Sequence, residues 1–221
     1  MIGTRTRNVQ DSKAWYNALS RYYDVIVDPF QGRLRRCGID FLNVSPDDHV
    51  LDIGCGTGRG LGTLQNAVGS DGTVVGIDIA EQMCRITTER LDDDSRSAVI
   101  CGDALALPFD SNSFDAVLVS FTLELFEEDH QMAVLDEIQR VLAPGGRLCV
   151  IAPSTASDLI SPLYERFNDV FPTLVDSRPL DVSGVLSRAD FEILRVQIEW
   201  VLVVPVELVF GRCNPSTGDR P

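Results

Sequence analysis

The sequence VLDIGCGTG, residues Val50–Gly58, decides the fold of this chain. An apolar run enters a turn in which Gly54, Gly56 and Gly58 stand at alternate positions. Glycine has no Cβ, so a ligand can lie directly against the main chain of such a turn. The turn leads into a helix start, whose unpaired N–H groups and dipole favour a polar or anionic group. The pattern predicts a strand–loop–helix junction that binds a ligand.

The spacing of these glycines distinguishes two kinds of nucleotide-binding turn. A dinucleotide fingerprint needs G-x-G-x-x-G, and Arg59 occupies the sixth position of that frame. Later frames fail as well, because they place Leu61 or Thr63 where the third glycine should be. The chain carries G-x-G-x-G preceded by Asp52 instead.

Composition limits the partners of the chain. Its 221 residues include 33 acidic and 19 basic side chains, for a net charge of −14. That length suits one α/β domain with a full core, and the acidic balance argues against a nucleic acid partner. The six cysteines form no C-x-x-C pair, and no run resembles a signal-peptide core or a membrane span. We expect a reduced, cytoplasmic protein without a membrane span; peripheral membrane contact is compatible with this composition.

Apolar residues alternate between strand and helix periodicity, which is typical of a parallel sheet with helices on both faces. Near-continuous runs of Val, Ile and Leu indicate central strands buried on both sides. Helical spacing between them predicts one helix that stops at Gly69 and another that stops at Pro144. The five expected strands are His49–Ile53, Thr73–Ile77, Ala98–Cys101, Phe114–Ser120 and Arg147–Ala152.

Two further strands are expected near the C-terminus, over Phe191–Trp200 and Val201–Phe210. Too few residues separate them for a helical crossover, so they should pair as an antiparallel hairpin. Proline cannot donate to a strand ladder, so Pro205 belongs at a sheet edge or a bulge.

The remaining segments complete a single domain over residues 1–221. We expect an N-terminal helical lid over residues 10–45, in which an amphipathic helix breaks at Asp28-Pro29. Residues 153–190 are rich in proline and aromatic side chains and read as a substrate-side insertion. Residues 213–221 are polar and are expected to form a frayed tail.

More motifs follow the glycine turn in order. Asp78 ends the second strand in VVGIDIA, 20 residues after Gly58, and Asp103 follows the third strand in ICGDALALPF. The fourth strand reads SFDAVLVS, and RVLAPGGRL leads into the fifth. Together these motifs resemble the class I S-adenosylmethionine-dependent methyltransferases, and most closely the ubiquinone/menaquinone-biosynthesis C-methyltransferases and phospholipid N-methyltransferases. The resemblance covers about residues 10–212, with its specific motifs within 50–152.

The resemblance implies a Rossmann-like three-layer α/β/α fold, with a mostly parallel seven-stranded sheet and an antiparallel C-terminal strand at its edge. It also implies S-adenosyl-L-methionine as cofactor and S-adenosyl-L-homocysteine as product. Asp78 would accept hydrogen bonds from both ribose hydroxyls, and Asp103 would accept one from the adenine amine. The implied cofactor-binding residues are Tyr23, Asp52, Gly54, Cys55, Gly56, Gly58, Asp78, Ile79, Met83, Asp103, Ala104 and Ser120.

Several of these residues have a structural alternative. Asp52 can bind loop amides rather than the methionine ammonium, and Asp78 can cap a helix. Met83 can be a core methionine rather than a platform for adenine, and Tyr23 a core aromatic rather than a cover for the cofactor carboxylate. Ala80 departs from the family, in which Ser or Thr often caps the next helix here.

On the acceptor side, the candidate catalytic residues are Tyr22, Glu124 and Arg178. Glu124 could act as a base, attract a cationic acceptor or be a solvated loop acid; Arg178 could hold an anionic acceptor or pair with a neighbouring Asp. Methyl transfer mainly requires an acceptor lone pair in line with the S–CH₃ bond and exclusion of water. No metal site is expected, because the three consecutive acids at 92–94 point in different directions.

The sequence therefore predicts methyl transfer to a nucleophilic atom of a small, partly apolar acceptor. It does not distinguish a quinone-, phospholipid- or thiol-like acceptor. The alternatives are a nicotinamide-dependent oxidoreductase, another reaction of the same cofactor such as aminopropyl transfer, and a non-catalytic subunit that binds the cofactor for stability.

Overall fold

The computed structural model describes residues 28–91, 96–155, 179–201 and 204–213. The helices in order are α2 (Asp28–Leu42), α3 (Arg59–Ala67), α4 (Glu81–Arg90), the short 3₁₀ helix η1 (Leu123–Leu125), α5 (Glu128–Val141) and α7 (Val182–Arg188). The strands are β1 (His49–Ile53), β2 (Thr73–Asp78), β3 (Ser97–Cys101), β4 (Phe114–Ser120), β5 (Leu142–Pro153), β6 (Phe191–Val201) and β7 (Val204–Cys213).

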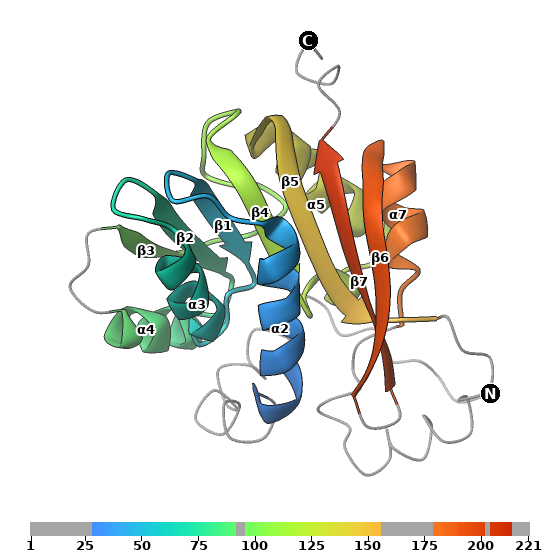
Figure 1. The fold of residues 1–221 in the computed structure, drawn as a ribbon, viewed down its shortest axis with the longest axis horizontal. Helices are drawn as coiled ribbons and strands as arrows, with labels where there is room; N and C mark the ends of the chain where they lie inside the picture. The colour runs from blue at the N-terminus through green and yellow to red at the C-terminus, as the bar shows by residue number, and fades with distance from the viewer. Residues whose placement is uncertain (1–27, 92–95, 156–178, 202–203, 214–221) are drawn as a thin grey trace.

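The seven strands form one sheet in the order β3-β2-β1-β4-β5-β7-β6 (Figure 1). Neighbouring strands from β3 to β5 pair in parallel, and β7 pairs antiparallel with both β5 and β6. This confirms the predicted mostly parallel sheet and the antiparallel C-terminal strand. The expected edge position is wrong, because β7 lies between β5 and β6 and the edge strand is β6.

Pro205 is correspondingly not at an edge or a bulge. It is the second residue of β7, and the register shift in the hairpin lies between Ile193 and Arg195. The Pro205 carbonyl accepts a hydrogen bond from the Ser154 amide, but the β5–β7 ladder ends at the pair Pro153–Val206. Proline has no N–H to donate. Because the ladder with β5 has already ended at this position, Pro205 removes no β5–β7 ladder hydrogen bond.

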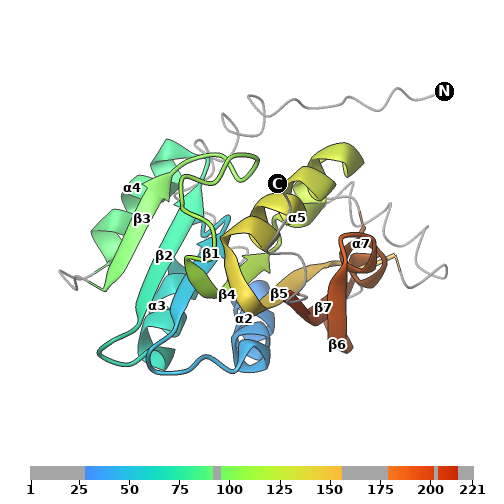
Figure 2. The same cartoon turned by 90° about the horizontal axis from the view of Figure 1, so that it is seen from above.

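Helices cover both faces of the sheet (Figure 2), and an apolar cluster lies between the helices and the sheet on each face. On one face, Leu34 of α2 and Leu61 of α3 belong to a cluster with Val50 of β1. On the other face, Ile138 of α5 belongs to a cluster with Leu51, the next residue of β1. Successive strand residues point to opposite faces, so central strands covered on both sides need the continuous apolar runs seen in the sequence.

The predicted break at Asp28-Pro29 coincides with the first residues of α2, a position where proline is favoured. Gly38 allows α2 to lie close to the sheet, since a Cβ there would be 2.6 Å from the Ile151 Cδ1 atom of β5. The expected lid residues 10–27 lie outside the described residues, as do 156–178 of the insertion. No helix among the described residues is long and apolar enough to cross a membrane.

Candidate cofactor and acceptor site

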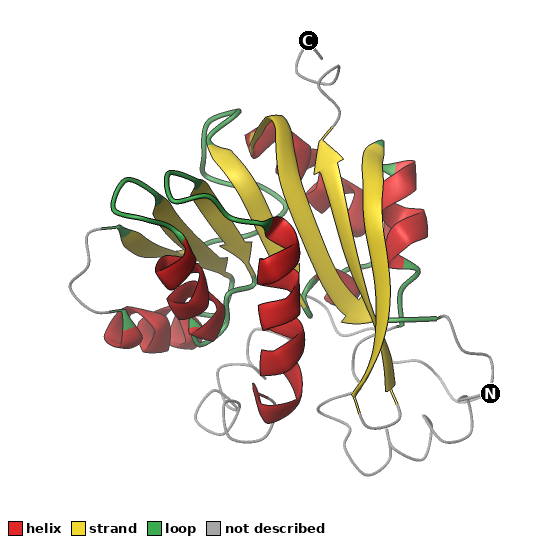
Figure 3. Ribbon diagram, in the orientation of Figure 1, coloured by secondary structure: helices red, strands yellow, loops and turns green. Residues whose placement is uncertain are grey.

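The carboxyl ends of the parallel strands lie along one edge of the sheet (Figure 3), and most of the described residues that the sequence predicts for the site belong to this edge or to the loops that follow it. The loop Gly54–Gly58 follows β1, Asp78 ends β2, and Asp103 follows β3. β4 ends at Ser120 and leads through Thr122 into η1. Ligands of open parallel sheets bind outside this carboxyl edge.

The three glycines of the loop share a backbone conformation but have different surroundings. Gly54, Gly56 and Gly58 have φ angles of 71°, 56° and 79°. A Cβ at Gly54 would be 2.1 Å from the Thr122 Oγ1 atom, and one at Gly58 would be 2.7 Å from the Thr87 Cγ2 atom. At Gly56, by contrast, no described atom lies within 4 Å of such a Cβ. Gly54 and Gly58 are thus required by packing, whereas Gly56 presents bare main chain to open space.

Asp78 fixes the position of this exposed main chain. Its Oδ2 accepts a hydrogen bond from the Gly56 amide at 2.9 Å, and its Oδ1 accepts one from the Ala80 amide at 2.9 Å. Burial raises the pKa of Asp78, and these main-chain N–H groups oppose the rise. An ionised carboxylate has about four lone-pair sites, so Asp78 can hold the loop and still accept from a ligand.

Asp52 lies in β1 beneath the loop and is only 2% exposed. Its Oδ2 is close to α3, because a Cβ at Gly60 would lie 2.6 Å away from it. Its Oδ1 is buried and has no hydrogen-bond partner among the described residues. Burial raises the pKa of Asp52 to about 7, the Arg35 guanidinium opposes the rise and Asp78 adds to it. A buried carboxyl oxygen without a partner is costly, so a polar ligand group beside it would be favourable.

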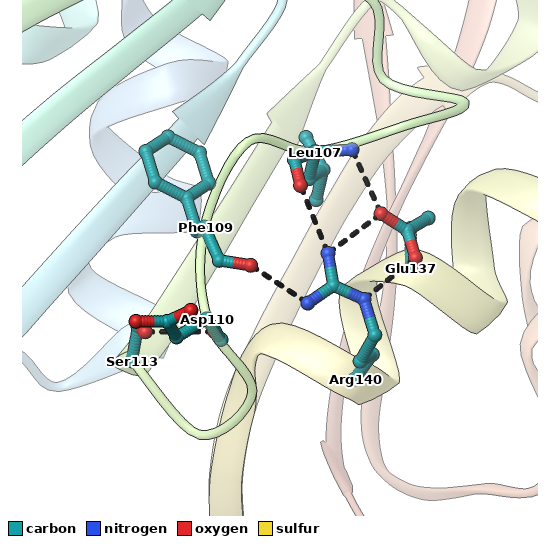
Figure 4. A network of polar contacts seen from close by, with 6 residues as sticks. All are labelled: Leu107, Phe109, Asp110, Ser113, Glu137 and Arg140. Atoms are coloured by element: carbon teal, nitrogen blue, oxygen red, sulfur yellow. Dashed lines mark hydrogen bonds and ion pairs between the residues drawn. The ribbon is translucent and has the colours of Figure 1, made fainter.

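The loop that carries Asp103 is held in place from α5 (Figure 4). The Asp103 Oδ1 accepts from the Leu105 amide at 3.0 Å, which closes a local turn. Glu137 Oε2 accepts from the Leu107 amide at 2.7 Å, and Arg140 donates to the Leu107 and Phe109 carbonyls at 2.9 and 2.7 Å. Glu137 and Arg140 also pair with each other through two 2.7 Å contacts, which lowers the pKa of Glu137.

Two hydrogen bonds hold the turn that follows β4. Phe121 has a φ of 54°, an uncommon conformation for a bulky residue, and its amide donates to the Ile151 carbonyl at 2.8 Å. Thr122 Oγ1 donates to the Ser120 carbonyl at 3.0 Å. This turn brings the Thr122 side chain against Gly54 and directs the chain into η1 beside the glycine loop.

Glu124, in η1, is only 3% exposed and is therefore not a solvated loop acid. Its Oε2 atom is buried without a hydrogen-bond partner among the described residues. Burial raises the pKa of Glu124 to about 8, and its own backbone N–H opposes the rise slightly. A carboxyl group with such a pKa can change its protonation state near neutral pH, as general acids and bases do.

The other predicted residues take several places. Cys55 and Met83 are buried, and burial raises the pKa of the Cys55 thiol well above its usual range. Ala104 is also buried, whereas Ile79 is half-buried beside Asp78. The candidates Tyr22, Tyr23 and Arg178 lie outside the described residues.

Sequence reasoning missed three residues that support the site. Thr87 donates to the Gly56 carbonyl at 2.7 Å, and Glu137 with Arg140 anchors the Asp103 loop. The i, i+3 spacing of Glu137 and Arg140 on a helix was a usable signal. Thr87 gave none, because its contact with the glycine loop joins distant parts of the chain.

Comparison with known proteins agrees with this geometry. Residues 50–146 match the family described as Methyltransferase domain. The ubiquinone/menaquinone biosynthesis C-methyltransferase of Paraburkholderia phymatum is 35% identical over 198 residues, which are 83% of this chain and 80% of the relative. This chain belongs to the class I S-adenosylmethionine-dependent methyltransferases. Membership of this family argues against the alternative that the chain is a nicotinamide-dependent oxidoreductase.

Other methyltransferases resemble this one over different shares of their length. The demethylmenaquinone methyltransferase of Lactococcus lactis is 36% identical over 132 residues, or 57% of this chain. The matched part of this chain spans 50% of the length of that relative. The N-methyltransferase NodS of Bradyrhizobium japonicum, solved with S-adenosyl-L-homocysteine, superposes with a TM-score of 0.71 at 17% identity, covering 95% of this chain and 100% of NodS.

The described residues of this methyltransferase fit an S-adenosyl cofactor. Gly56 leaves room for a ligand against the main chain, Asp78 keeps free acceptor capacity, and Asp52 has an oxygen without a partner among the described residues. S-Adenosylmethionine carries hydroxyl, amine and ammonium donors, and these acceptors are complementary to them.

Proposed function

We propose that this methyltransferase transfers the methyl group of S-adenosylmethionine in line to a nucleophilic atom of a small, partly apolar acceptor. The observation that carries the proposal is the bare main chain at Gly56, held by Asp78 above the buried carboxyl of Asp52. The relatives are named for ubiquinone, menaquinone and demethylmenaquinone, which favours a quinone-like aromatic acceptor over a phospholipid or a thiol.

Each carboxylate has a distinct role in the proposal. Asp78 accepts hydrogen bonds from the ribose hydroxyls, and Asp103 accepts one from the adenine amine. Asp52 attracts the ammonium group of the methionine part. Met83 and Ala104 supply apolar surface near the adenine. When bound, the cofactor supplies an electrophilic methyl group on a positively charged sulfur.

Glu124 is proposed as the base that takes a proton from the substrate that is methylated. It follows the turn that packs Thr122 against Gly54, so its buried carboxyl belongs to the same edge as the cofactor loop. Its buried Oε2 has no hydrogen-bond partner among the described residues, so in the proposal its lone pairs take the proton from a hydroxyl or an acidified carbon. A cation bound nearby lowers the pKa of a carboxyl group and so favours the ionised form that a base requires.

The direct test is to incubate the purified chain with a methyl-labelled donor and cell extract, and to identify the labelled product. We expect one labelled small molecule, more soluble in organic solvent than in water. A pure demethylated quinone and a phospholipid are then compared as acceptors. Binding of S-adenosylhomocysteine without any labelled product would instead identify a non-catalytic cofactor-binding subunit.

A further inference from the structure

The edge strand β6 exposes a row of apolar side chains. Of the five large hydrophobic residues that are exposed among the described residues, four lie on this strand. No described strand pairs with the outer side of β6, which lies at the end of the sheet (Figure 1). A long apolar edge strand readily pairs with another chain. The four residues are Leu194 (41% exposed), Val196 (46%), Ile198 (46%) and Trp200 (55%).

The opposite face of β6 carries opposite charges at defined positions. The Arg195 guanidinium lies 3.9 Å from the ring centre of Phe41 in α2, and Glu199 Oε2 lies 3.4 Å from Arg33 Nη2 in the same helix. Gln197 lies between them, accepting from Arg195 at 3.0 Å and donating to Glu199 at 2.7 Å. Arg195, Gln197 and Glu199 therefore lie on the α2 face, and Val196, Ile198 and Trp200 alternate with them on the other face. Leu194 lies at the register shift between Ile193 and Arg195.

We propose that β6 pairs antiparallel with β6 of a second copy of this chain, about a two-fold axis at Gln197. This register places Arg195 opposite the partner's Glu199, and Glu199 opposite the partner's Arg195. On the other face it places Val196 opposite the partner's Ile198, and Ile198 opposite the partner's Val196. The two seven-stranded sheets join into one continuous sheet.

The sequence of β6 selects this register. Moving the axis by half a residue places Arg195 opposite the partner's Trp200 or the partner's Ile198, and moving it by one residue separates Arg195 from Glu199 altogether. Opposite charges and apolar pairs directly across a sheet are favourable, whereas mismatched pairs are not. A two-fold interface must be self-complementary, and the pattern around Gln197 has this property on both faces.

The test is the association state of the full chain in a charge-swap experiment, measured by sedimentation velocity over a range of concentrations. We expect a dimer for the native chain. Arg195→Glu and Glu199→Arg should each raise the dissociation constant at least tenfold, because like charges then face each other. The double variant Arg195→Glu/Glu199→Arg should restore the native value.

Two further variants complete the experiment. Ile198→Lys should abolish the dimer. The matched control swaps the exposed charges of Arg188 in α7 and Glu128 in α5, which lie 3.4 Å apart and do not belong to β6, and should leave association unchanged. S-Adenosylhomocysteine binding checks that each variant is folded. A monomer at every concentration, or a dimer that the single charge reversals do not weaken, overturns the proposal; so does failure of the double variant to recover.

Discussion

Glu124 is the residue for which the proposed chemistry makes the sharpest prediction. Glu124→Gln keeps the size of the side chain but cannot accept a proton. We expect kcat to fall about 100-fold, as for the loss of a general base, while the affinity for S-adenosylhomocysteine changes less than twofold. Steady-state kinetics with the identified acceptor, together with calorimetry, measure both quantities.

The pH profile of the same enzyme separates a base from a structural carboxyl. Burial raises the pKa of Glu124 to about 8, so the rate of the native enzyme should rise with pH until the carboxyl is ionised. This rise should be missing in Glu124→Gln. An unchanged profile in the variant shows that another group accepts the proton.

Asp78 is predicted to act on both the loop and the ligand. Asp78→Ala removes acceptors for two amides and for the ribose, and hydrogen bonds to a charged group contribute roughly 1.5–3 kcal/mol. We expect the affinity for S-adenosylhomocysteine to fall by about tenfold or more. Calorimetry measures this loss, and unfolding in urea reports how much stability is lost with it. Native affinity in the variant shows that the ribose is held elsewhere.

The three glycines of the loop show how much of the site the sequence predicts. The glycine pattern predicted the loop and its backbone, because left-handed turns select glycine. It could not tell Gly56, which faces open space, from Gly54 and Gly58, which pack against threonines. That difference depends on Thr122 and Thr87, which are far from the loop in sequence.

At the scale of elements, the loop after β3 depends on α5. Glu137 and Arg140 provide the contacts that anchor the Leu107 and Phe109 main chain. Arg140→Met should cost about 1–3 kcal/mol of unfolding free energy, because it leaves these carbonyls and the Glu137 carboxylate without their donor. It should also weaken cofactor binding several-fold by loosening the Asp103 loop.

A double-mutant cycle is the control for this prediction. If Glu137 and Arg140 act as one anchor, Glu137→Gln/Arg140→Met should cost less than the sum of the two single changes. Urea unfolding supplies the energies and calorimetry the affinities. Strict additivity, or native cofactor affinity in Arg140→Met, contradicts the anchoring role.

The sequence predicted most elements because their periodicity is local. β1 and β4 match the expected bounds, and the antiparallel hairpin is present. The place of β7 inside the sheet was not predicted, since strand order depends on contacts between distant segments. β7 also extends to Cys213, which pairs with Phe191, so this strand is longer than the expected strand, which ended at Phe210.

For the molecule as a whole, the buried carboxyls predict an unusual pH dependence of stability. Burial raises the pKa of Asp52 to about 7 and of Glu124 to about 8, from 3.8 and 4.5. Between about pH 4 and 8 the folded chain therefore binds more protons than the unfolded chain, and its unfolding free energy falls as pH rises. Urea unfolding of the cofactor-free chain at pH 5, 6, 7 and 8 measures the slope.

Variants assign this slope to particular groups. Asp52→Asn and Glu124→Gln should each flatten it, since an amide does not titrate. Glu137, whose pKa is lowered, acts only at lower pH and should not affect this range. A slope that persists unchanged in both variants would falsify the assignment.

The main chain at Gly56 is proposed to form part of the cofactor site. Gly56→Ala and Gly145→Ala are a matched pair, because both glycines have a positive φ and no described atom within 4 Å of the position that a Cβ would take. Each change costs roughly 1–2 kcal/mol of backbone strain, but Gly145 lies near the beginning of β5, whereas the proposed site is at the carboxyl ends of the parallel strands. Calorimetry with S-adenosylhomocysteine should show at least tenfold weaker binding for Gly56→Ala and native affinity for Gly145→Ala. Equal affinities in the two variants would contradict this role of the Gly56 main chain.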